Sequence, residues 1–381
     1  MKFKQFTKHQ GFGASAFMGV FYAVAMLLIF LIGYSALPGN MDELKIAIVN
    51  DDAGQSGEQI AKQLGESLPF EMQTNLSNDK ALEKLSDNKV ALVIHIPENF
   101  TESAQKGEGA QIDFTVNEAS ATMVSSSMNS IVKEINTQLS ASFSTQTAQG
   151  ILMSMNVPEE QAAAMAAQIE NAYVGNYVIM NDIPDGMHNN MLPMFLTMAC
   201  YVGAMIAAMQ LVQTYKFNRG KASRFKLFGY VQGSALIIAV ISSIVAVLIA
   251  FFINDLDSSI LAKLVGQQIL LYMAAFNVCA IFTFLIGEAG MILNIPVLLS
   301  QTIANGATMP RDMMYSYFDV VSYITPMYHS VQAYYAVMFG STEQMPFIIG
   351  LVLVGIGAAV INLLIVTLLH KKEPAPKEVM N

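Results

Sequence analysis

The sequence predicts an α-helical membrane protein with six transmembrane helices and a large extracellular α/β domain with a helical stalk, inserted between helices 1 and 2. The 381 residues are 54% hydrophobic and only 13% charged, with a mean hydropathy of +0.44, whereas soluble domains carry about 25% charged residues. Several apolar runs are long enough to cross the ~30 Å hydrocarbon core of a bilayer. Charges of opposite sign are also segregated along the chain, which argues against nucleic-acid binding.

The stretch Tyr215–Tyr230 sets the predicted orientation. Apolar runs flank it at Met191–Thr214 and Val231–Ile253, and it contains no acidic residue. Short basic loops between spans stay on the cytoplasmic side of a membrane. The loop is either a topology signal alone or also a docking surface for a cytoplasmic partner. Its five cations are Lys216, Arg219, Lys221, Arg224 and Lys226.

The remaining spans follow by alternation from this loop. Ala14–Leu37 is predicted as the first span, because it is longer than the ~7–15-residue apolar region of a cleaved signal peptide. Later spans are predicted at Leu264–Gly287, Ala289–Asn305 and Pro346–Leu369, with an inner turn at Glu288. Both termini are therefore expected in the cytoplasm.

The predicted spans divide the chain into four segments. Residues 1–37 form an N-terminal interfacial segment and the first span, and residues 38–190 form the extracellular domain. Residues 191–370 form a five-helix membrane domain, and residues 371–381 form a cytoplasmic tail.

The polar segment 38–190 holds 21 of the 29 acidic residues. Its β-branched runs predict three strands, at Leu44–Asn50, Val90–Ile96 and Ala110–Val116. Helical stretches between them complete a small α/β lobe, at Glu58–Leu68, Asp79–Asp87 and Glu98–Gln105. Two long helices are predicted to form the stalk, Ala119–Ala148 and Pro158–Tyr173.

Motif searches find no catalytic chemistry. The chain has no G-x-x-x-x-G-K-[ST] phosphate-binding loop, so it is expected to bind no cofactor itself. Asp51, Asp52 and Glu58 offer oxygen ligands for a divalent cation, but they lack EF-hand spacing, and no metal is predicted. No charged residue lies within an apolar span, although ion-coupled transporters need such groups. Any energy source is therefore expected outside this chain.

A broken segment follows the predicted span that ends at Asn305. Pro310 and Pro326 interrupt this segment, and Gly306 permits a sharp turn. Non-helical backbone at membrane depth is tolerated only where protein or a wet cavity covers it, so the segment predicts an outer gate. The alternative is an ordinary loop with interfacial aromatic residues. The gate residues are Asn305, Gly306, Pro310, Arg311, Tyr317, Phe318, Pro326 and Tyr328, with Asp312 beside Arg311 at the mouth and Tyr315 in the apolar lid.

The order of one helix, a large external domain and five helices resembles the ABC-2 type export permeases. The closest resemblance is to their YhgE/Pip-like (phage infection protein) branch. It is carried by Leu298–Gly340, with Gln301, Gly306, Thr308, Pro310, Phe318 and Pro326–Tyr328, and by Ile46–Asp52 and Val90–Phe100. Many members of the branch carry an arginine shortly before the final glycine, and this chain has Gln332-Ala333-Tyr334-Tyr335 instead.

The resemblance implies a permease subunit of an ATP-driven exporter in the bacterial cell membrane. A second permease subunit, identical or different, and a cytoplasmic ABC ATPase that binds ATP and Mg²⁺ would be its partners, together with membrane lipid. The ATPase would meet Tyr215–Tyr230, and two outer half-helices would lie between Gly306 and Met345. The exported compound would be amphipathic or lipid-like, such as an antibiotic, a toxin or a lipid, which suggests a role in multidrug resistance.

Two other classes of function stay open. The chain could be a membrane-anchored surface receptor or a secretion accessory protein that acts through residues 38–190. An intramembrane enzyme is disfavoured, because no paired acids, histidine cluster or activated serine lies near the predicted bilayer.

Overall fold

The computed structural model describes residues 29, 40–106, 109–154, 173–184 and 187–370. Two compact units emerge. Among the described residues, the sheet unit contains those from Asn40 to Ile183 together with Phe339–Thr342, and the helical unit contains the others. The predicted first span, the predicted tail and nearly all of the predicted helix Pro158–Tyr173 lie outside the described residues.

The sheet unit is built on a mixed five-stranded sheet with the order β2-β1-β3-β4-β5. Strands β3 and β4 are antiparallel and the other neighbours are parallel. The three predicted strands are confirmed as β1, β3 and β4. The strands are β1 (Lys45–Asn50), β2 (Glu71–Gln73), β3 (Leu92–Ile96), β4 (Ala110–Asn117) and β5 (Tyr173–Met180).

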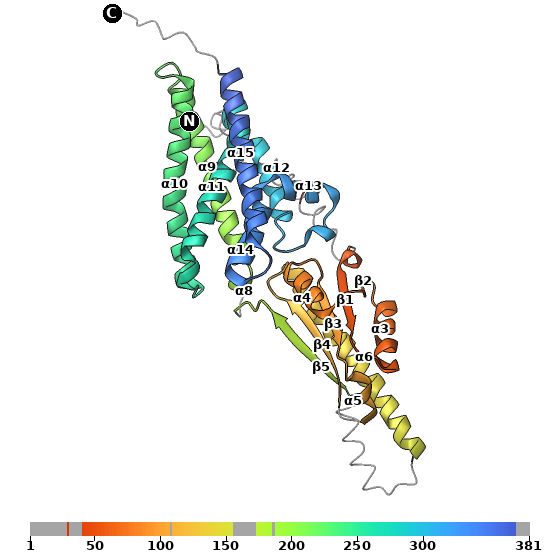
Figure 1. Ribbon diagram of the computed structural model, residues 1–381. Coiled ribbons are helices and arrows are strands. Elements are labelled where there is room, and N and C mark those ends of the chain that lie inside the picture. The colour runs from red at the N-terminus through yellow and green to blue at the C-terminus, as the bar shows by residue number, and fades with distance from the viewer. Residues whose placement is uncertain (1–28, 30–39, 107–108, 155–172, 185–186, 371–381) are drawn as a thin grey trace, which may run out of the picture. The chain divides into compact units, whose positions relative to one another are not determined.

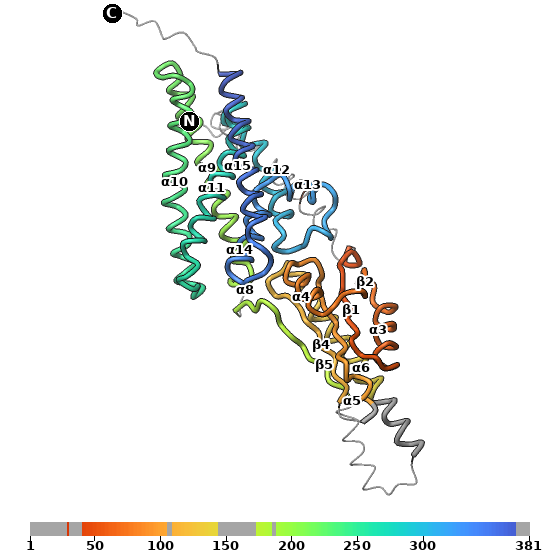
Figure 2. The backbone as a smooth tube through the Cα atoms, viewed as in Figure 1, coloured from red at the N-terminus to blue at the C-terminus, as the bar shows by residue number. Residues whose placement is uncertain are grey.

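Four helices surround this sheet, and each overlaps a predicted helix: α3 (Gln55–Ser67), α4 (Asn78–Ser86), α5 (Phe100–Lys106) and the 33-residue α6 (Thr122–Ser154). Helix α6 packs along β4 and β5 (Figure 2). The predicted helix Pro158–Tyr173 is wrong at its last residue, because Tyr173 is the first residue of β5. The β5 sequence YVGNYVIM is rich in the aromatic and β-branched residues that favour strands.

In the described part of the helical unit, four long helices lie side by side (Figure 1). They are α9 (Leu192–Phe217), α10 (Arg224–Ile253), α11 (Leu261–Ile286) and α15 (Gln344–Leu368). The short helix α8 (Met187–Asn190) precedes α9. Three further short helices lie between α11 and α15: α12 (Gly290–Ile303), α13 (Ser316–Ile324) and α14 (Pro326–Phe339).

Within the described residues, four segments are long and apolar enough to cross a membrane: Leu192–Phe217, Arg224–Ile253, Ser258–Ile303 and Gln344–Leu368. The separate crossing predicted at Ala289–Asn305 corresponds to α12. Its 14 residues measure about 21 Å at 1.5 Å per residue, which is shorter than a ~30 Å hydrocarbon core. The count of six spans therefore stays a prediction.

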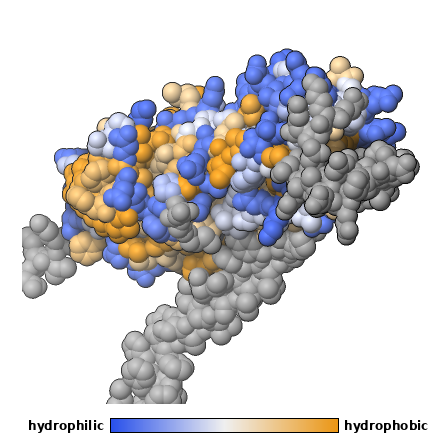
Figure 3. All heavy atoms as spheres, turned by 90° about the horizontal axis from the view of Figure 1, so that it is seen from below, coloured by the Kyte–Doolittle hydropathy of each residue, from blue (hydrophilic) through white to orange (hydrophobic). Residues whose placement is uncertain are grey.

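The surface of the long helices suits a lipid environment. Large apolar side chains are exposed along α10 and α15, among them Ile237, Ile241, Ile249, Phe252 and Leu353. Hydrophobic residues gather over part of the surface seen in Figure 3. Apolar exposure on this scale indicates contact with a membrane or another protein.

Inside the unit, neutral amides join the helices. Gln268 of α11 donates to the Leu196 carbonyl of α9 at 3.2 Å. Asn277 of α11 pairs with Gln232 of α10 at 2.8 Å, and its carbonyl accepts from Asn362 of α15, also at 2.8 Å. Such interhelical bonds contribute about 0.6 kcal/mol each on average in membrane proteins, and they fix the helices that carry the sites described below.

Candidate functional site

The predicted basic loop is a tight turn between α9 and α10. Ser223 caps α10, since its Oγ accepts from the Lys226 backbone N–H at 3.3 Å. The Lys221 N–H donates to the Asn218 carbonyl at 3.1 Å, and Gly220 has a φ of +89° that favours glycine. The five predicted cations are therefore gathered on this turn and on the helix ends beside it.

Two of these cations hold the ends of other helices. Lys216 Nζ donates to the Thr283 carbonyl in the last turn of α11 at 3.0 Å. Arg224 Nη1 donates to the Thr367 carbonyl in the last turn of α15 at 2.7 Å. Positive side chains near helix C-termini are stabilising because they complement the helix dipole. Lys216 and Arg224 thus have a structural role that the sequence pattern did not reveal.

Two other cations lie on the outside of the loop. Lys221 is exposed, with its Nζ 4.6 Å from the centroid of the Phe217 ring. Lys226 is exposed as well, and its Nζ lies 5.8 Å from the centroid of the Tyr230 ring. A docking role for the loop therefore rests most directly on Lys221 and Lys226.

The predicted inner turn lies beside the basic loop. Glu288 is exposed in the turn Gly287–Ala289 that joins α11 to α12. Together with Lys216 and Phe217 it lines a cavity of about 680 Å³. The structure thus brings Glu288 close to Lys216, the first residue of the cationic set.

The predicted gate segment is anchored on α14. Gly306 has a φ of +78°, and a Cβ there would lie 2.7 Å from both Gln332 Nε2 and the Tyr328 ring. Asn305 is fully buried, and its Oδ1 accepts from the Ala307 N–H at 2.8 Å. The positive φ and these close contacts both favour glycine at position 306.

Arg311 is clamped between two aromatic rings. Its guanidinium carbon lies 3.7 Å from the Tyr323 centroid and 3.5 Å from the Tyr328 centroid. Arg311 Nε donates to Ser322 Oγ at 2.7 Å, and Nη2 donates to the Ser322 carbonyl at 3.2 Å. Stacking and hydrogen bonds therefore hold Arg311 against α13 and α14, and its place at the mouth of a gate stays a prediction.

The other predicted gate residues lie in two environments. Phe318 is only 3% exposed, so it belongs to the core rather than to a surface lid. Tyr317 is 59% exposed, and its hydroxyl pairs with Ser300 Oγ of α12 at 2.9 Å. Pro310 precedes a short 3-10 turn, and Pro326 begins α14, where its missing N–H costs no hydrogen bond.

An apolar groove of about 600 Å³ lies among α11, α12, α13 and α15. Tyr317, Ser300 and Thr325 provide its polar side chains, and the remaining lining is apolar. No sequence motif marks this groove. Its residues come from four separate helices, and each one alone looks like ordinary membrane packing.

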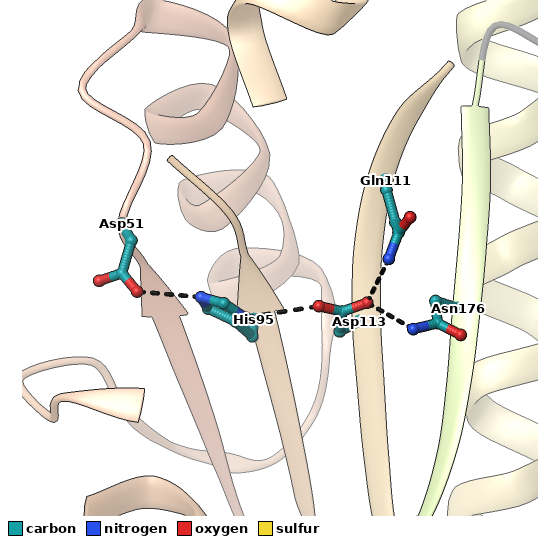
Figure 4. Close-up of polar contacts among 5 residues, drawn as sticks. All are labelled: Asp51, His95, Gln111, Asp113 and Asn176. Carbon is teal, nitrogen blue, oxygen red and sulfur yellow. Dashed lines mark hydrogen bonds and ion pairs between the residues drawn. The ribbon is translucent and has the colours of Figure 1, made fainter. Parts of the chain in front are cut away.

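In the sheet unit, polar side chains form a row across four strands (Figure 4). His95 Nε2 lies 2.9 Å from Asp51 Oδ2, and its Nδ1 lies 3.5 Å from Asp113 Oδ2. Gln111 and Asn176 each donate to Asp113 Oδ1 at 2.7 Å. The histidine therefore joins neighbouring strands, and no described group of three His, Cys, Asp or Glu residues is arranged to hold a metal ion.

Asp52, considered above as a cation ligand, instead organises the loop after β1. Its carboxylate accepts from Thr101 Oγ1 at 2.5 Å and from the Thr101 N–H at 3.1 Å. The N–H groups of Gly54 and Gly57 donate to it at 3.2 Å each. Burial alone would raise the pKa of Asp52, but these hydrogen bonds outweigh burial and lower it. The carboxylate thus links the start of α3 to the start of α5.

We expect Gly306→Ala to destabilise the gate segment. The left-handed backbone costs a residue with a Cβ roughly 1–2 kcal/mol, and the new methyl group would overlap Tyr328 and Gln332. The midpoint of thermal unfolding of the purified chain in detergent should therefore fall by several degrees. Gly266→Ala in α11 is the matched control, because open space surrounds that Cβ position; an equal fall in both variants would contradict the anchoring of the segment on α14.

Comparisons with known proteins agree with the helical architecture. A family described as "ABC-2 family transporter protein" matches residues 15–366. The linearmycin resistance permease protein LnrN of Bacillus subtilis is 31% identical over 124 residues, which is 32% of this chain and 32% of that protein. The chain therefore matches about a third of the length of this curated relative.

Among solved structures, a domain of a putative ABC type-2 transporter from Thermotoga maritima MSB8 is similar. The likeness has a TM-score of 0.27 and 19% identity, and it covers 35% of this chain and 86% of that one. The narrower resemblance to the YhgE/Pip-like branch stays a prediction. Because the family model matches residues 15–366, this chain belongs to the ABC-2 family of transporter proteins.

Proposed function

We propose that this chain is the permease subunit of an ATP-driven exporter that moves an amphipathic or lipid-like compound out of the cell. The observation that carries the proposal is the apolar groove beside the gate segment. Its volume of about 600 Å³ lies within the range of about 300–1,000 Å³ that small-molecule sites occupy.

The chemistry of the groove favours an amphipathic compound. Apolar side chains form most of its wall, whereas the Ser300–Tyr317 hydroxyl pair supplies a polar contact at 2.9 Å. Leu353 and Ile324 line the groove and are also exposed on the surface. A compound could therefore reach the groove from the lipid phase, with its apolar part against the helices and a polar group near Tyr317.

The distribution of charge favours an external energy source. Among the charged residues of the four candidate spans, Lys216, Arg224, Lys226 and Lys263 lie near span ends, and Glu288 lies in the turn Gly287–Ala289 that joins α11 to α12. The interiors of these helices therefore carry no Asp, Glu, Lys or Arg that could form a proton relay of the kind that drives coupled transport. An ABC ATPase with its own ATP and Mg²⁺ would supply the work. Lys221 and Lys226 are the proposed contact, and a second permease subunit would complete the transporter.

The orientation is also part of the proposal. The basic loop is placed in the cytoplasm by the positive-inside rule, with residues 38–190 outside and both termini inside in a six-span arrangement. The similarity to a permease named for linearmycin resistance supports an antibiotic as one class of exported compound.

One observation favours the alternative of a surface receptor. A cavity of about 800 Å³ lies between α6 and β5 in the sheet unit, lined by Asn129, Lys133, Asn136, Tyr173 and Tyr177 among others. This polar lining could bind an external ligand. A receptor would keep its function without any ATPase partner, whereas the exporter would lose it.

The proposed orientation predicts a labelling pattern. In a background without Cys200 and Cys279, cysteines at the exposed positions Ser126 and Ser258 should react with a membrane-impermeant maleimide in intact cells. A cysteine at Lys221, which is also exposed, should react only after the membrane is permeabilised. Labelling of the Lys221 position in intact cells would contradict the proposed orientation, because it would place the basic loop outside the cell.

The proposed groove predicts a transport defect when it is filled. Gly357→Leu adds a side chain within the groove, and the Cβ position of Gly357 meets no atom within 4 Å. We expect at least about a tenfold loss of resistance to amphipathic antibiotics, which corresponds to a free-energy change of about 1.4 kcal/mol.

Gly233→Leu in α10 is the matched control. It makes the same change at a position with equally open space, and Gly233 does not line the groove. Protein levels in the membrane are measured for both variants. Equal resistance in wild-type and Gly357→Leu cells would show that the compound does not pass through this groove.

A further inference from the structure

Two tyrosine–asparagine pairs line the cavity of about 800 Å³ between α6 and β5 in the sheet unit. The Tyr173 hydroxyl donates to Asn136 Oδ1 at 2.6 Å, and the Tyr177 hydroxyl donates to Asn129 Oδ1. These bonds use neither the N–H donors of the two amides nor the lone pairs of the two tyrosine oxygens. Each pair therefore offers a hydrogen-bond donor and an acceptor next to each other.

The backbone repeats these pairs along the cavity. Asn129 and Asn136 are two helical turns apart on one face of α6, which is about 10.5 Å at 1.5 Å per residue. Tyr173 and Tyr177 share a face of β5, because alternate residues of a strand point to the same side. Between the tyrosines, Gly175 leaves room for an amide, since a Cβ at this position would overlap Asn136 Oδ1.

A cation lies between the two asparagines. Lys133 follows Asn129 by one turn on the same face of α6, and it lines the cavity. Its side chain is exposed, and it takes part in none of the ion pairs formed among the described residues. No Asp or Glu is among the described residues that line this cavity.

Two carboxylates close to the cavity have other partners. Glu134 of α6 accepts from Gln138 Nε2 at 2.8 Å, and Glu118 Oε2 accepts from the Ile183 N–H at 3.2 Å. Burial raises the pKa of Tyr177, and the charge of Glu118 raises it further. Neither glutamate lines the cavity, so the described wall carries a positive charge at its centre.

These polar groups indicate the chemistry of a ligand. A sugar hydroxyl both donates and accepts a hydrogen bond, so it can donate to a tyrosine oxygen and accept from the neighbouring amide. Two such pairs about 10.5 Å apart suit a ligand with hydroxyl groups at several places, which a free inorganic anion does not provide. The ammonium group of Lys133 between the pairs favours a carboxylate on the same ligand.

We propose that the cavity between α6 and β5 binds an acidic oligosaccharide, with its hydroxyl groups on the two tyrosine–asparagine pairs and a carboxylate at Lys133. The proposal gives a ligand class to the surface-receptor alternative. It rests on the proposed orientation only for the side of the membrane on which the sugar lies, which is the outer side if residues 38–190 are extracellular. Neither export nor ATP hydrolysis is needed for this binding.

The test measures sugar binding by the purified full-length chain in detergent micelles, without an ATPase. Isothermal titration calorimetry compares trigalacturonate, which carries carboxylates, with maltotriose, a neutral trisaccharide, at low ionic strength where exposed charges are least screened. We expect trigalacturonate to bind about fivefold more tightly, a difference of about 1 kcal/mol, because only this sugar can pair with the ammonium group of Lys133.

Three variants separate the charge from the hydrogen bonds. Lys133→Gln should remove most of the preference for trigalacturonate. Lys80→Gln is the matched control, because Lys80 is an exposed helix residue of the sheet unit that does not line the cavity, and it should change binding less than about twofold. Asn129→Ala removes an amide donor and should weaken the binding of both sugars about threefold. The midpoint of thermal unfolding of each variant shows whether its fold is kept.

Any of four results would overturn the proposal. Absence of measurable binding, or equal affinities of the wild-type chain for the two sugars, would mean that the cavity does not recognise an acidic sugar. Equal effects of Lys133→Gln and Lys80→Gln would place the binding elsewhere on the chain. Displacement of trigalacturonate by an equal concentration of inorganic phosphate would make the cavity a site for a small anion. Failure of export with intact sugar binding would contradict the exporter and leave this proposal standing.

Discussion

The helical unit depends on two contacts between the basic loop and the ends of helices that are distant in sequence. Lys216 binds the Thr283 carbonyl of α11, and Arg224 binds the Thr367 carbonyl of α15. Both helices contribute residues to the apolar groove, including Val278 of α11 and Gly357 of α15. Because the same loop holds both helix ends, a displacement of the loop would act on the two walls of the groove together.

The interior of the unit shows how helices can be fixed without charge. Neutral amides join α9 to α11 through Gln268, and α10, α11 and α15 through Asn277 and Asn362. An ionised group at these positions would be costly in lipid, whereas an amide satisfies its hydrogen bonds at lower cost. This arrangement leaves cations at the helix ends, where Lys216 and Arg224 complement the helix dipoles.

Much of the architecture could be predicted from the sequence, because it depends on local pattern. Apolar runs marked α9, α10, α11 and α15, and β-branched runs marked β1, β3 and β4. Local sequence patterns could not reveal features that depend on contacts between distant residues. The groove is assembled from four helices, and Arg311 is stacked by tyrosines that lie 12 and 17 positions later in the chain. Strand β5 was not predicted, because the predicted helix before it extends to Tyr173.

The most direct test asks whether the groove changes conformation when the ATPase proposed as the energy source hydrolyses ATP. A single cysteine replaces Gly357 in a background without Cys200 and Cys279, and its reaction with an apolar maleimide is followed in membranes that contain the partner ATPase. If the loop transmits movement to α11 and α15, trapping the ATPase during ATP hydrolysis should change the labelling rate by at least about fivefold, a free-energy difference of about 1 kcal/mol. The same rate with and without trapped ATP would contradict the coupling of the loop to the groove.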